Sequence, residues 1–433
     1  MAEISAPIEH PRRRALNDEV HARPPDSLPT PCGASYLACV PELKPDALSP
    51  TDRLAELLRG FDVEAPPQTI KHFTTRLGAR RLRWERHTEY SRYTLIDTRA
   101  DAAPFSGASG IPGDWLATMR GQILVGLHAS IVEMPGWEQR VDEIGAEFFD
   151  GNVLIGSGVA DRSAVALTDL RIHADGFSRV LLINDGMSGP QTGRVLQRLL
   201  DIETYRMMAL LALPVAQELT PVLDRDEHEL AAIGEALIDA ESQQEQELLE
   251  RLTRLSAGSQ HRHLRSNYRF AAADAYYEIV LQRIHELREI RIPGLQTFEE
   301  FTTRRLTPAV KTCRAASRRQ QSILEQMARA TKLLSTRIDI ARQQQNQSLL
   351  ASMNRRVKAQ LRLQATVEGL SVAAVTYYVV GLIGALADGL AVGGLALDKS
   401  IVMAASVPVV AAAVFLGVRR LRRRISREEA ESR

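Results

Sequence analysis

Residues 369–387 read GLSVAAVTYYVVGLIGALA and residues 401–418 read IVMAASVPVVAAAVFLGV, and neither run contains a charged side chain. Each run is about as long as a helix must be to cross a bilayer core of roughly 30 Å. Backbone groups in hydrocarbon must satisfy their own hydrogen bonds, so two such runs form two helices. The sequence therefore predicts a transmembrane helical hairpin over residues 369–418, joined by the loop 388–400.

Basic residues flank the two open ends of this hairpin. They precede the first span at Arg355, Arg356, Lys358 and Arg362, and follow the second at Arg419, Arg420, Arg422, Arg423 and Arg424. The connecting loop carries Lys399 beside Asp388 and Asp398. Because basic residues favour the cytoplasmic side, we expect both termini in the cytoplasm and the loop outside. The alternative is a buried hairpin in a large soluble core, which the run lengths and the arginines disfavour.

A long basic helix leads into the first span. Thr307 and Pro308 predict its start, and no further glycine or proline occurs before Gly369. Unbroken to Ala387, such a helix is about 120 Å long at 1.5 Å per residue. Apolar or small residues recur three or four apart and predict a packed seam, at Ile323, Met327, Ala330, Leu334, Ile338 and Ala341, followed by the polar Gln345 and Ser348.

Charge suggests what this stalk packs against. Residues 218–254 are rich in acids, whereas residues 304–362 carry many arginines and lysines beside only Glu325 and Asp339. Helices are predicted at 190–213, ended or kinked by Pro214, and then at 224–255 and 261–291, with a turn at 256–260. The stalk packs either on these acidic helices or on copies of itself, and opposite charge favours the first.

The chain before the helices predicts an α+β domain over residues 32–188. Alternating apolar residues predict strands at 69–77, 80–87, 91–97, 123–132, 153–158, 164–172 and 179–184, with helices at 54–61 and 135–149 and a loop at 104–113. Consecutive hairpins followed by helices disfavour a parallel doubly wound sheet. The turn 184–194 lacks the lysine and spacing of a phosphate-binding loop, and Ser188, Pro190 and Gln191 fit a helix capping box.

Residues 1–31 contain six prolines and predict an extended or partly ordered arm. Asp18, Glu19 and His21 are ligand-type side chains, but no second cluster completes a coordination sphere, so docking of the arm on the body is favoured. The cysteines, Cys32, Cys39 and Cys313, have no metal-ligand spacing and are expected to be free thiols. We therefore predict no catalytic residue, no metal site and no cofactor.

Residues 10–25 read HPRRRALNDEVHARPP and resemble the opening signature of an uncharacterised bacterial family of membrane-anchored proteins, domain of unknown function 3422. Three later stretches resemble the same family: IETYRM at 202–207, IPGLQT at 292–297 and VEGLSV at 367–372. With the two spans, the resemblance implies a multi-pass protein of the bacterial inner (cytoplasmic) membrane. It implies no activity.

The predicted layout is also similar to that of the CorA-type divalent-cation transporters, in which five stalks converge and the first spans line a pore. Their Gly-Met-Asn motif is absent, because residues 381–389 read GLIGALADG. The resemblance implies a homo-oligomer of about five copies and a divalent cation as partner. The candidate pore-lining residues are Gly369, Ala373, Thr376, Val380, Gly384 and Asp388. Close packing of membrane helices is the alternative role for these small residues.

The predicted organisation is an extended arm (1–31), an α+β cytoplasmic domain (32–188), an antiparallel helical region (189–300), a basic stalk helix (301–368), a transmembrane hairpin (369–418, spans 369–387 and 401–418) and a basic cytoplasmic tail (419–433). Two functions are compatible with it, and the sequence favours the first. One is a non-enzymatic inner-membrane protein with a CorA-like oligomeric architecture that conducts a cation. The other is a membrane-anchored scaffold that binds a cytoplasmic partner without transport. Nucleic-acid binding is not expected, because no aromatic residues interrupt the basic run; the expected partners are the lipid bilayer and copies of the chain.

Overall fold

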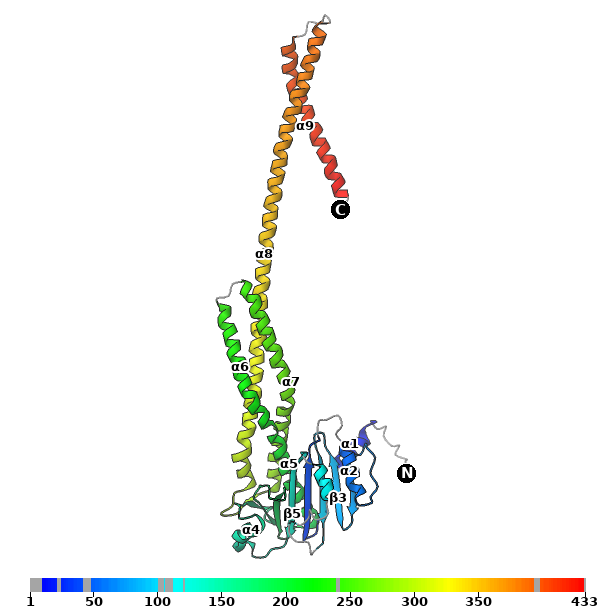
Figure 1. The fold of residues 1–433 in the computed structure, drawn as a ribbon, viewed down its shortest axis with the longest axis vertical. Helices are drawn as coiled ribbons and strands as arrows, with labels where there is room; N and C mark the ends of the chain where they lie inside the picture. The colour runs from blue at the N-terminus through cyan, green and yellow to red at the C-terminus, as the bar shows by residue number, and fades with distance from the viewer. Residues whose placement is uncertain are drawn as a thin grey trace, which may run out of the picture. The chain divides into compact units, whose positions relative to one another are not determined.

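The computed structural model describes residues 10–21, 25–41, 48–99, 105, 112–119, 121–238, 242–392 and 398–431. The chain divides into two compact units (Figure 1). The first comprises Met1–Ala240 and Glu247–Thr331 and contains the sheet and the helices packed on it, and the second comprises Glu241–Gln246 and Lys332–Arg433.

The first unit is built on a nine-stranded sheet in the order β2-β3-β4-β1-β5-β8-β7-β6-β9. Its strands are β1 (Cys32–Cys39), β2 (His72–Leu77), β3 (Arg80–Arg86), β4 (Ser91–Asp97), β5 (Ile123–Val132), β6 (Ile155–Val159), β7 (Ala164–Thr168), β8 (Ser178–Asn184) and β9 (Ile290–Arg291). β5 and β8 pair in parallel, whereas the other named neighbours are antiparallel. The sheet is therefore mixed, and the α+β prediction is confirmed.

Strand β1 lies in the middle of the sheet, although the sequence predicts no strand there. Its alternate residues point to opposite faces, as in any strand. Tyr36 joins the core beneath α5 (Gly189–Leu210), and Leu37 joins the core beneath α2 (Pro50–Arg59). Because both faces are buried, the polar and apolar alternation that reveals a half-exposed strand is missing. Strand β9, only two residues long, is likewise not predicted.

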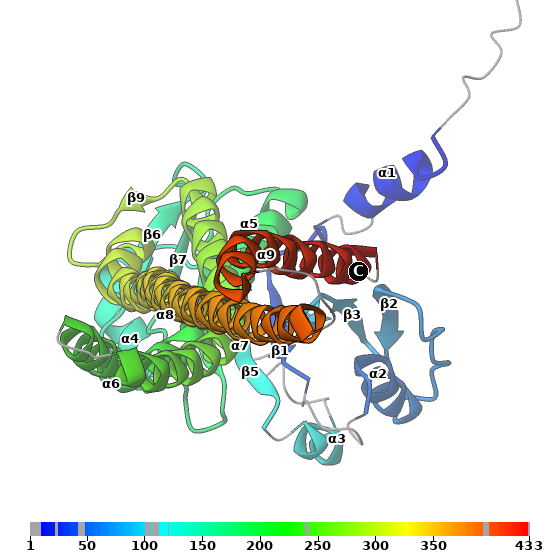
Figure 2. The same cartoon turned by 90° about the horizontal axis from the view of Figure 1, so that it is seen from above.

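The remaining short elements follow the sequence closely. The six predicted strands before residue 172 and the strand at 179–184 are present with shifts of a few residues at their ends. The predicted helix at 135–149 appears as a 3-10 turn, Trp137–Arg140, followed by α4 (Val141–Phe148). Helix α2 lies beside β2 and β3 (Figure 2). An unpredicted helix, α3 (Gly113–Thr118), follows the predicted loop 104–113, most of which lies outside the described residues.

The arm is not wholly extended, because residues Arg13–His21 form helix α1. This nine-residue stretch contains no proline, whereas Pro11 precedes it and Pro24 follows it. A helix is therefore sterically allowed only between these two positions. The described side chains of α1 are exposed.

The helical region differs from the prediction at one turn and at the start of one helix. Residues 256–260, predicted as a turn, lie inside α7 (Ser242–Leu287), and α6 (Ala212–Ile238) begins well before residue 224. Gly258 costs a helix interior about 1 kcal/mol relative to alanine, but Leu252 and Ser259 are buried around it and their packing maintains the helix. Pro214 sits in the first turn of α6, where a proline is tolerated.

Helix α8 (Phe298–Val392) also begins earlier than predicted. The cap is Thr297: its hydroxyl accepts from the amide of Glu300, and the Glu300 carboxylate accepts from the amide of Thr297. Thr307, the predicted cap, lies within the helix and its hydroxyl bonds with that of Tyr277. From Pro308 to Ala387 the helix is unbroken, as predicted, and it continues to Val392, into the segment predicted as a loop.

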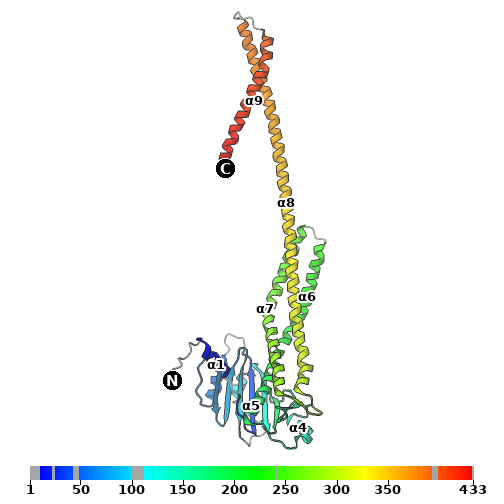
Figure 3. The same ribbon diagram turned by 180° about the vertical axis from the view of Figure 1, so that it is seen from behind.

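In the first unit, α6, α7 and the beginning of α8 lie side by side (Figures 1 and 3). Arg319 of α8 pairs with Asp224 of α6 at 2.6 Å, and Arg314 of α8 pairs with Asp274 of α7 at 2.8 Å. Ile323 and Met327 of the predicted seam are buried. The prediction that the basic stalk packs on the acidic helices is therefore confirmed for this part of α8.

In the second unit, Leu334 and Ile338 continue the buried seam, whereas Gln345 and Ser348 are exposed. Arg337 pairs with Glu245 at 3.1 Å. Beyond Arg342 every described side chain up to Val367 except Ser352 is exposed. The unit ends with the last part of α8 and α9 (Lys399–Glu431), which continues as one helix through the predicted second span and into the tail.

Candidate functional site

The C-terminal hairpin buries three of the six candidate pore-lining residues. Thr376, Val380 and Gly384 are four residues apart along α8, and all are buried. A Cβ atom placed on Gly384 would lie 2.7 Å from the Met403 sulfur of α9. This face of α8 therefore packs at Gly384 against the second helix of its own chain. Gly369, Ala373 and Asp388, the other three candidates, are exposed.

The outward faces of the same hairpin carry large apolar side chains. On α8, Leu370, Tyr377 and Leu382 are 74, 78 and 64% exposed, and on α9, Ile401 and Val409 are 67 and 68% exposed. In water such a surface is unfavourable, at about 25 cal/mol for each Å² of apolar area. The surface suits hydrocarbon, in which the backbone bonds of two helices are satisfied internally.

Three helical stretches are long and apolar enough to cross a membrane, by length and composition alone: Gly189–Ile238, Phe298–Gly389 and Ser400–Arg420. The first was not predicted as a span, and it includes α5, whose Val195, Leu196 and Leu199 are buried in the core on the sheet. In its most apolar window 33% of the residues are buried inside the fold, against 17% and 0% in the other two stretches. The other two contain the predicted spans.

The residues predicted to orient the hairpin lie outside its packed interface. Arg355, Arg356, Lys358 and Arg362 are exposed on α8, and Arg419 and Arg420 are exposed at the end of the second predicted span. The side chains of Arg422, Arg423 and Arg424 lie outside the described residues. Exposed guanidinium and ammonium groups at these positions are available to lipid phosphates.

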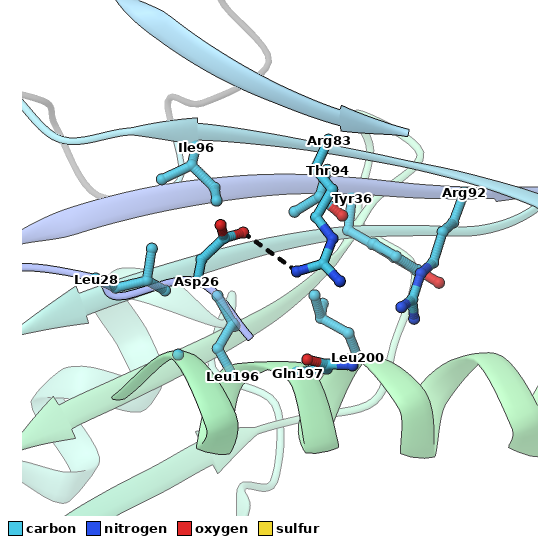
Figure 4. A pocket seen from close by; sticks show the side chains of 11 residues that line it. Asp26, Leu28, Tyr36, Arg83, Arg92, Thr94, Ile96, Leu196, Gln197 and Leu200 are labelled. Atoms are coloured by element: carbon cyan, nitrogen blue, oxygen red, sulfur yellow. Dashed lines mark ion pairs between the residues drawn. The ribbon is translucent and has the colours of Figure 1, made fainter. Parts of the chain in front are cut away.

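A second candidate site lies within the first unit, between the sheet and α5 (Figure 4). A cavity of about 30 Å³ is lined there by Tyr36 and Thr94 of the sheet, by Arg83 and Arg92 from β3 and β4, and by Gln197 of α5. This is room for one or two water molecules. The sequence predicts no site at this place.

Residues 25–31, which we call the strap, cover this cavity. The Leu28 amide donates to the Gly189 carbonyl at 3.0 Å, and the Leu28 side chain is buried. The Asp26 carboxylate pairs with Arg81 Nη2 at 2.9 Å and with Arg83 Nη1 at 3.5 Å. Figure 4 shows this carboxylate pointing toward the Arg83 guanidinium. The predicted docking of the arm is therefore made by the strap.

A buried ion network extends from the cavity. Glu85 pairs with Arg92 and, at 2.7 Å, with Arg83, and Arg92 pairs with Asp201 of α5 at 2.9 Å. Burial alone would raise the pKa of Glu85, but the guanidiniums of Arg92 and Arg83 outweigh it and lower that pKa to about 2. Arg283 of α7 also pairs with Asp201, at 3.1 Å. The network therefore ties the sheet to two helices.

The ligand-type side chains named from the sequence are not brought together into a metal site among the described residues. Asp18 is exposed on α1, and the side chains of Glu19 and His21 lie outside the described residues. Among the described residues no group of three or more His, Cys, Asp or Glu side chains is placed to hold a metal ion. Cys32, Cys39 and Cys313 are free and buried, and burial raises the pKa of the Cys32 thiol to about 12, which makes it unreactive.

The turn at 184–194 is a helix cap. The Ser188 and Gln191 side chains form a capping box at the start of α5, with Pro190 in the first turn, as predicted. Asn184 holds the turn from the other side, accepting from the Met187 amide at 2.8 Å.

The cavity lined by Arg83 and Arg92, which we call the arginine cavity, was not predicted from the sequence because its residues come from distant parts of the chain. The available signal was charge within strands: Arg83, Glu85 and Arg92 stand in β3 and β4, where buried charges need partners. That signal predicts a pairing without identifying Asp26 or Asp201 as the partners.

Comparison with known proteins adds a family and no activity. A family model described as "Protein of unknown function (DUF3422)" matches residues 8–425. No curated protein matches the chain.

Proposed function

The chain belongs to the DUF3422 family, and from this premise we propose that it is a non-enzymatic integral membrane protein whose C-terminal hairpin anchors a large cytoplasmic body. One observation carries the proposal. The hairpin turns the uncharged face around Gly384 inward and large apolar side chains such as Leu382 and Val409 outward. This arrangement suits lipid on the outside, whereas a buried soluble hairpin would have its outer faces covered.

The proposed orientation places both termini in the cytoplasm of a bacterium, with the loop between α8 and α9 outside the inner membrane. Exposed Arg355, Arg356, Arg419 and Arg420 at the two inner ends support it, because basic residues are retained on the cytoplasmic side. The same residues would face an anionic inner leaflet.

Single cysteines test this orientation. The three native cysteines are buried, so labelling by a membrane-impermeant maleimide reports the introduced position. We expect Ser400→Cys to be labelled in intact spheroplasts and Ser352→Cys, on the other side of the first span, only after permeabilisation. Labelling of both, or of Ser352→Cys alone, in intact spheroplasts would contradict the orientation, and recovery of the wild type in the soluble fraction would contradict the anchor.

Between the two functions, we favour the membrane-anchored scaffold, whose body binds a cytoplasmic partner, over cation conduction. Three of the six candidate pore-lining residues, Thr376, Val380 and Gly384, lie on the buried face of α8 that contacts α9 at Gly384. A residue that packs against its own second helix is not available to line a path between copies. The absent Gly-Met-Asn motif supports the same choice.

Flux measurements separate the two functions. Purified protein in proteoliposomes is expected to give no Mg²⁺ influx above that of empty vesicles. Influx that disappears when Asp388 is replaced by asparagine would support a cation path at the outer end of the first span and would overturn the scaffold proposal.

A further inference from the structure

We propose that the arginine cavity beneath the strap is a binding site for an oxyanion, a carboxylate or phosphate group, and that Asp26 occupies it as an internal ligand. The site is independent of the membrane anchor and goes beyond the function proposed above. It lies wholly within the first unit, between β3, β4 and α5.

Asp26 makes the contacts that a bound oxyanion would make. Its two carboxylate oxygens pair separately with Arg81 and Arg83, at 2.9 and 3.5 Å. Arginine guanidiniums are the preferred partners of carboxylate and phosphate groups because their planar donors match two oxygens at once. The cavity continues past this carboxylate toward Arg92, Thr94 and Gln197, which offer further polar groups.

Charge balance supports the assignment. Arg81, Arg83 and Arg92 meet three carboxylates around the cavity, those of Asp26, Glu85 and Asp201. Arg283 shares Asp201 but has a carboxylate of its own in Glu286, at 2.9 Å. Glu85 and Asp201 are anchored within β3 and α5, whereas Asp26 is carried by the strap. If the strap leaves, the site has one uncompensated positive charge in a partly buried place, which is unfavourable until an anion replaces it.

The strap is held by backbone contacts at two glycines of α5. A Cβ atom on Gly193 would lie 1.6 Å from the Asp26 carbonyl oxygen, and one on Gly189 would lie 2.7 Å from the Ser27 hydroxyl oxygen. No side chain fits at Gly193 while the strap is seated. The helix itself does not require glycine, because alanine is the better helix former. Glycine at position 193 is therefore explained by the close approach of the strap. We call Gly189 and Gly193 the glycine seat.

The glycine seat supplies a variant that opens the site without touching its arginines. Gly193→Ala should displace the strap while stabilising α5 locally. Gly234→Ala in α6 is the matched control, because a Cβ atom there meets nothing within 4 Å. Both variants would be made in the full-length protein in detergent.

The measurements are binding of inorganic phosphate and of acetate, and hydrogen exchange of the strap. The Leu28 amide reports the strap because it donates to the Gly189 carbonyl. We expect phosphate to speed this exchange in the wild type and in Gly234→Ala. In Gly193→Ala we expect the Leu28 amide to exchange rapidly without ligand. We also expect the anion to bind at least about tenfold more tightly than in the wild type, because the site is then no longer closed in most molecules. The anion that binds more tightly, phosphate or acetate, identifies the ligand class.

Asp26→Asn removes the internal carboxylate without steric change and should also tighten binding. Adding Arg81→Met to Gly193→Ala should weaken anion binding again. Such a loss would show that the anion binds at this site. The proposal is overturned if neither opened variant binds phosphate or acetate, or if binding leaves Leu28 protected and is insensitive to Arg81→Met.

Discussion

At the scale of single residues, the first unit depends on buried charges and on a buried imidazole that are satisfied by distant partners. Removing one member of a buried ion pair costs about 3–5 kcal/mol, because the other charge is left without a partner. Glu85, Arg92 and Asp201 form such a set across the sheet and α5. His128 on β5 has uncharged partners instead. The centroids of its ring and of the Phe177 ring lie 4.0 Å apart, and Nδ1 bonds with the Ser35 hydroxyl at 2.9 Å.

These residues predict acid lability of the first unit. Burial, which penalises the imidazolium, lowers the pKa of His128 from 6.5 to about 4. Between these values the unfolded chain binds a proton that the folded chain does not, so stability falls as pH falls from about 6.5 to about 4. From pH 7 to pH 5 the loss is about 2 kcal/mol. Glu85, with its lowered pKa, adds a loss below pH 4.5.

Denaturant unfolding followed at pH 7 and pH 5 measures this effect. His128→Gln should make the free energy of unfolding nearly independent of pH in this range, whereas His72→Gln, at an exposed residue of β2, should behave as the wild type. An equal pH dependence in wild type and His128→Gln would show that another group is responsible.

At the scale of elements, α8 has three different environments along its length. Its beginning packs on α6 and α7 through ion pairs and the seam at Ile323 and Met327. Its middle, from Arg342 to Val367, is almost entirely exposed, and its end forms the hairpin with α9. Only the end combines an uncharged sequence with exposed large apolar residues, and this difference is the basis for proposing that it lies in lipid.

A charge on the outer face of the hairpin should therefore be costly, and the same charge on the middle of α8 should not. Leu382 and Leu363 are 64 and 66% exposed, respectively. Arginine at the centre of a membrane span costs about 2.5–3.5 kcal/mol on insertion scales. We expect Leu382→Arg to lower the membrane-inserted fraction after alkaline extraction and Leu363→Arg to leave it unchanged. Equal extraction of the two variants would argue against a span at Leu382.

At the scale of the whole molecule, self-association would need a shared surface, and the middle of α8 carries exposed apolar side chains. Leu350, Met353, Val357 and Leu361 lie three or four residues apart and are 50–63% exposed. Spacings of three, four and four residues place them along one face of the helix. Copies anchored in one membrane by the same hairpin emerge from the same side, so their helices would be parallel. We propose self-association along this seam.

Disulfide cross-linking in native membranes tests the seam. Val357→Cys should cross-link between copies under mild oxidation, because identical residues of a parallel seam lie opposite each other. Ala359→Cys, at an exposed residue about 200° further around the helix, should not cross-link. The buried native cysteines give little background. Cross-linking that is equal at both positions, or absent at both, would contradict the seam.

Local sequence determined the parts of this protein whose signals are local. The two uncharged runs, the flanking arginines, the hairpin strands at Arg80–Arg86 and Ser91–Asp97 and the Ser188 cap each follow from residues a few positions apart. Such features depend on helix periodicity, strand alternation and charge, which act over one or two turns of chain.

Tertiary structure alone decided what depends on distant partners. Strand β1 is recognisable only once both of its faces are covered, and α7 continues through Gly258 because burial outweighs an unfavourable residue. The assignment of Thr376, Val380 and Gly384 to a buried face depended on the neighbouring α9. The strap, its glycine seat and the arginine cavity join residues 26, 83, 92 and 193, and no local pattern brings them together because packing energy comes from contacts made only after the chain has folded.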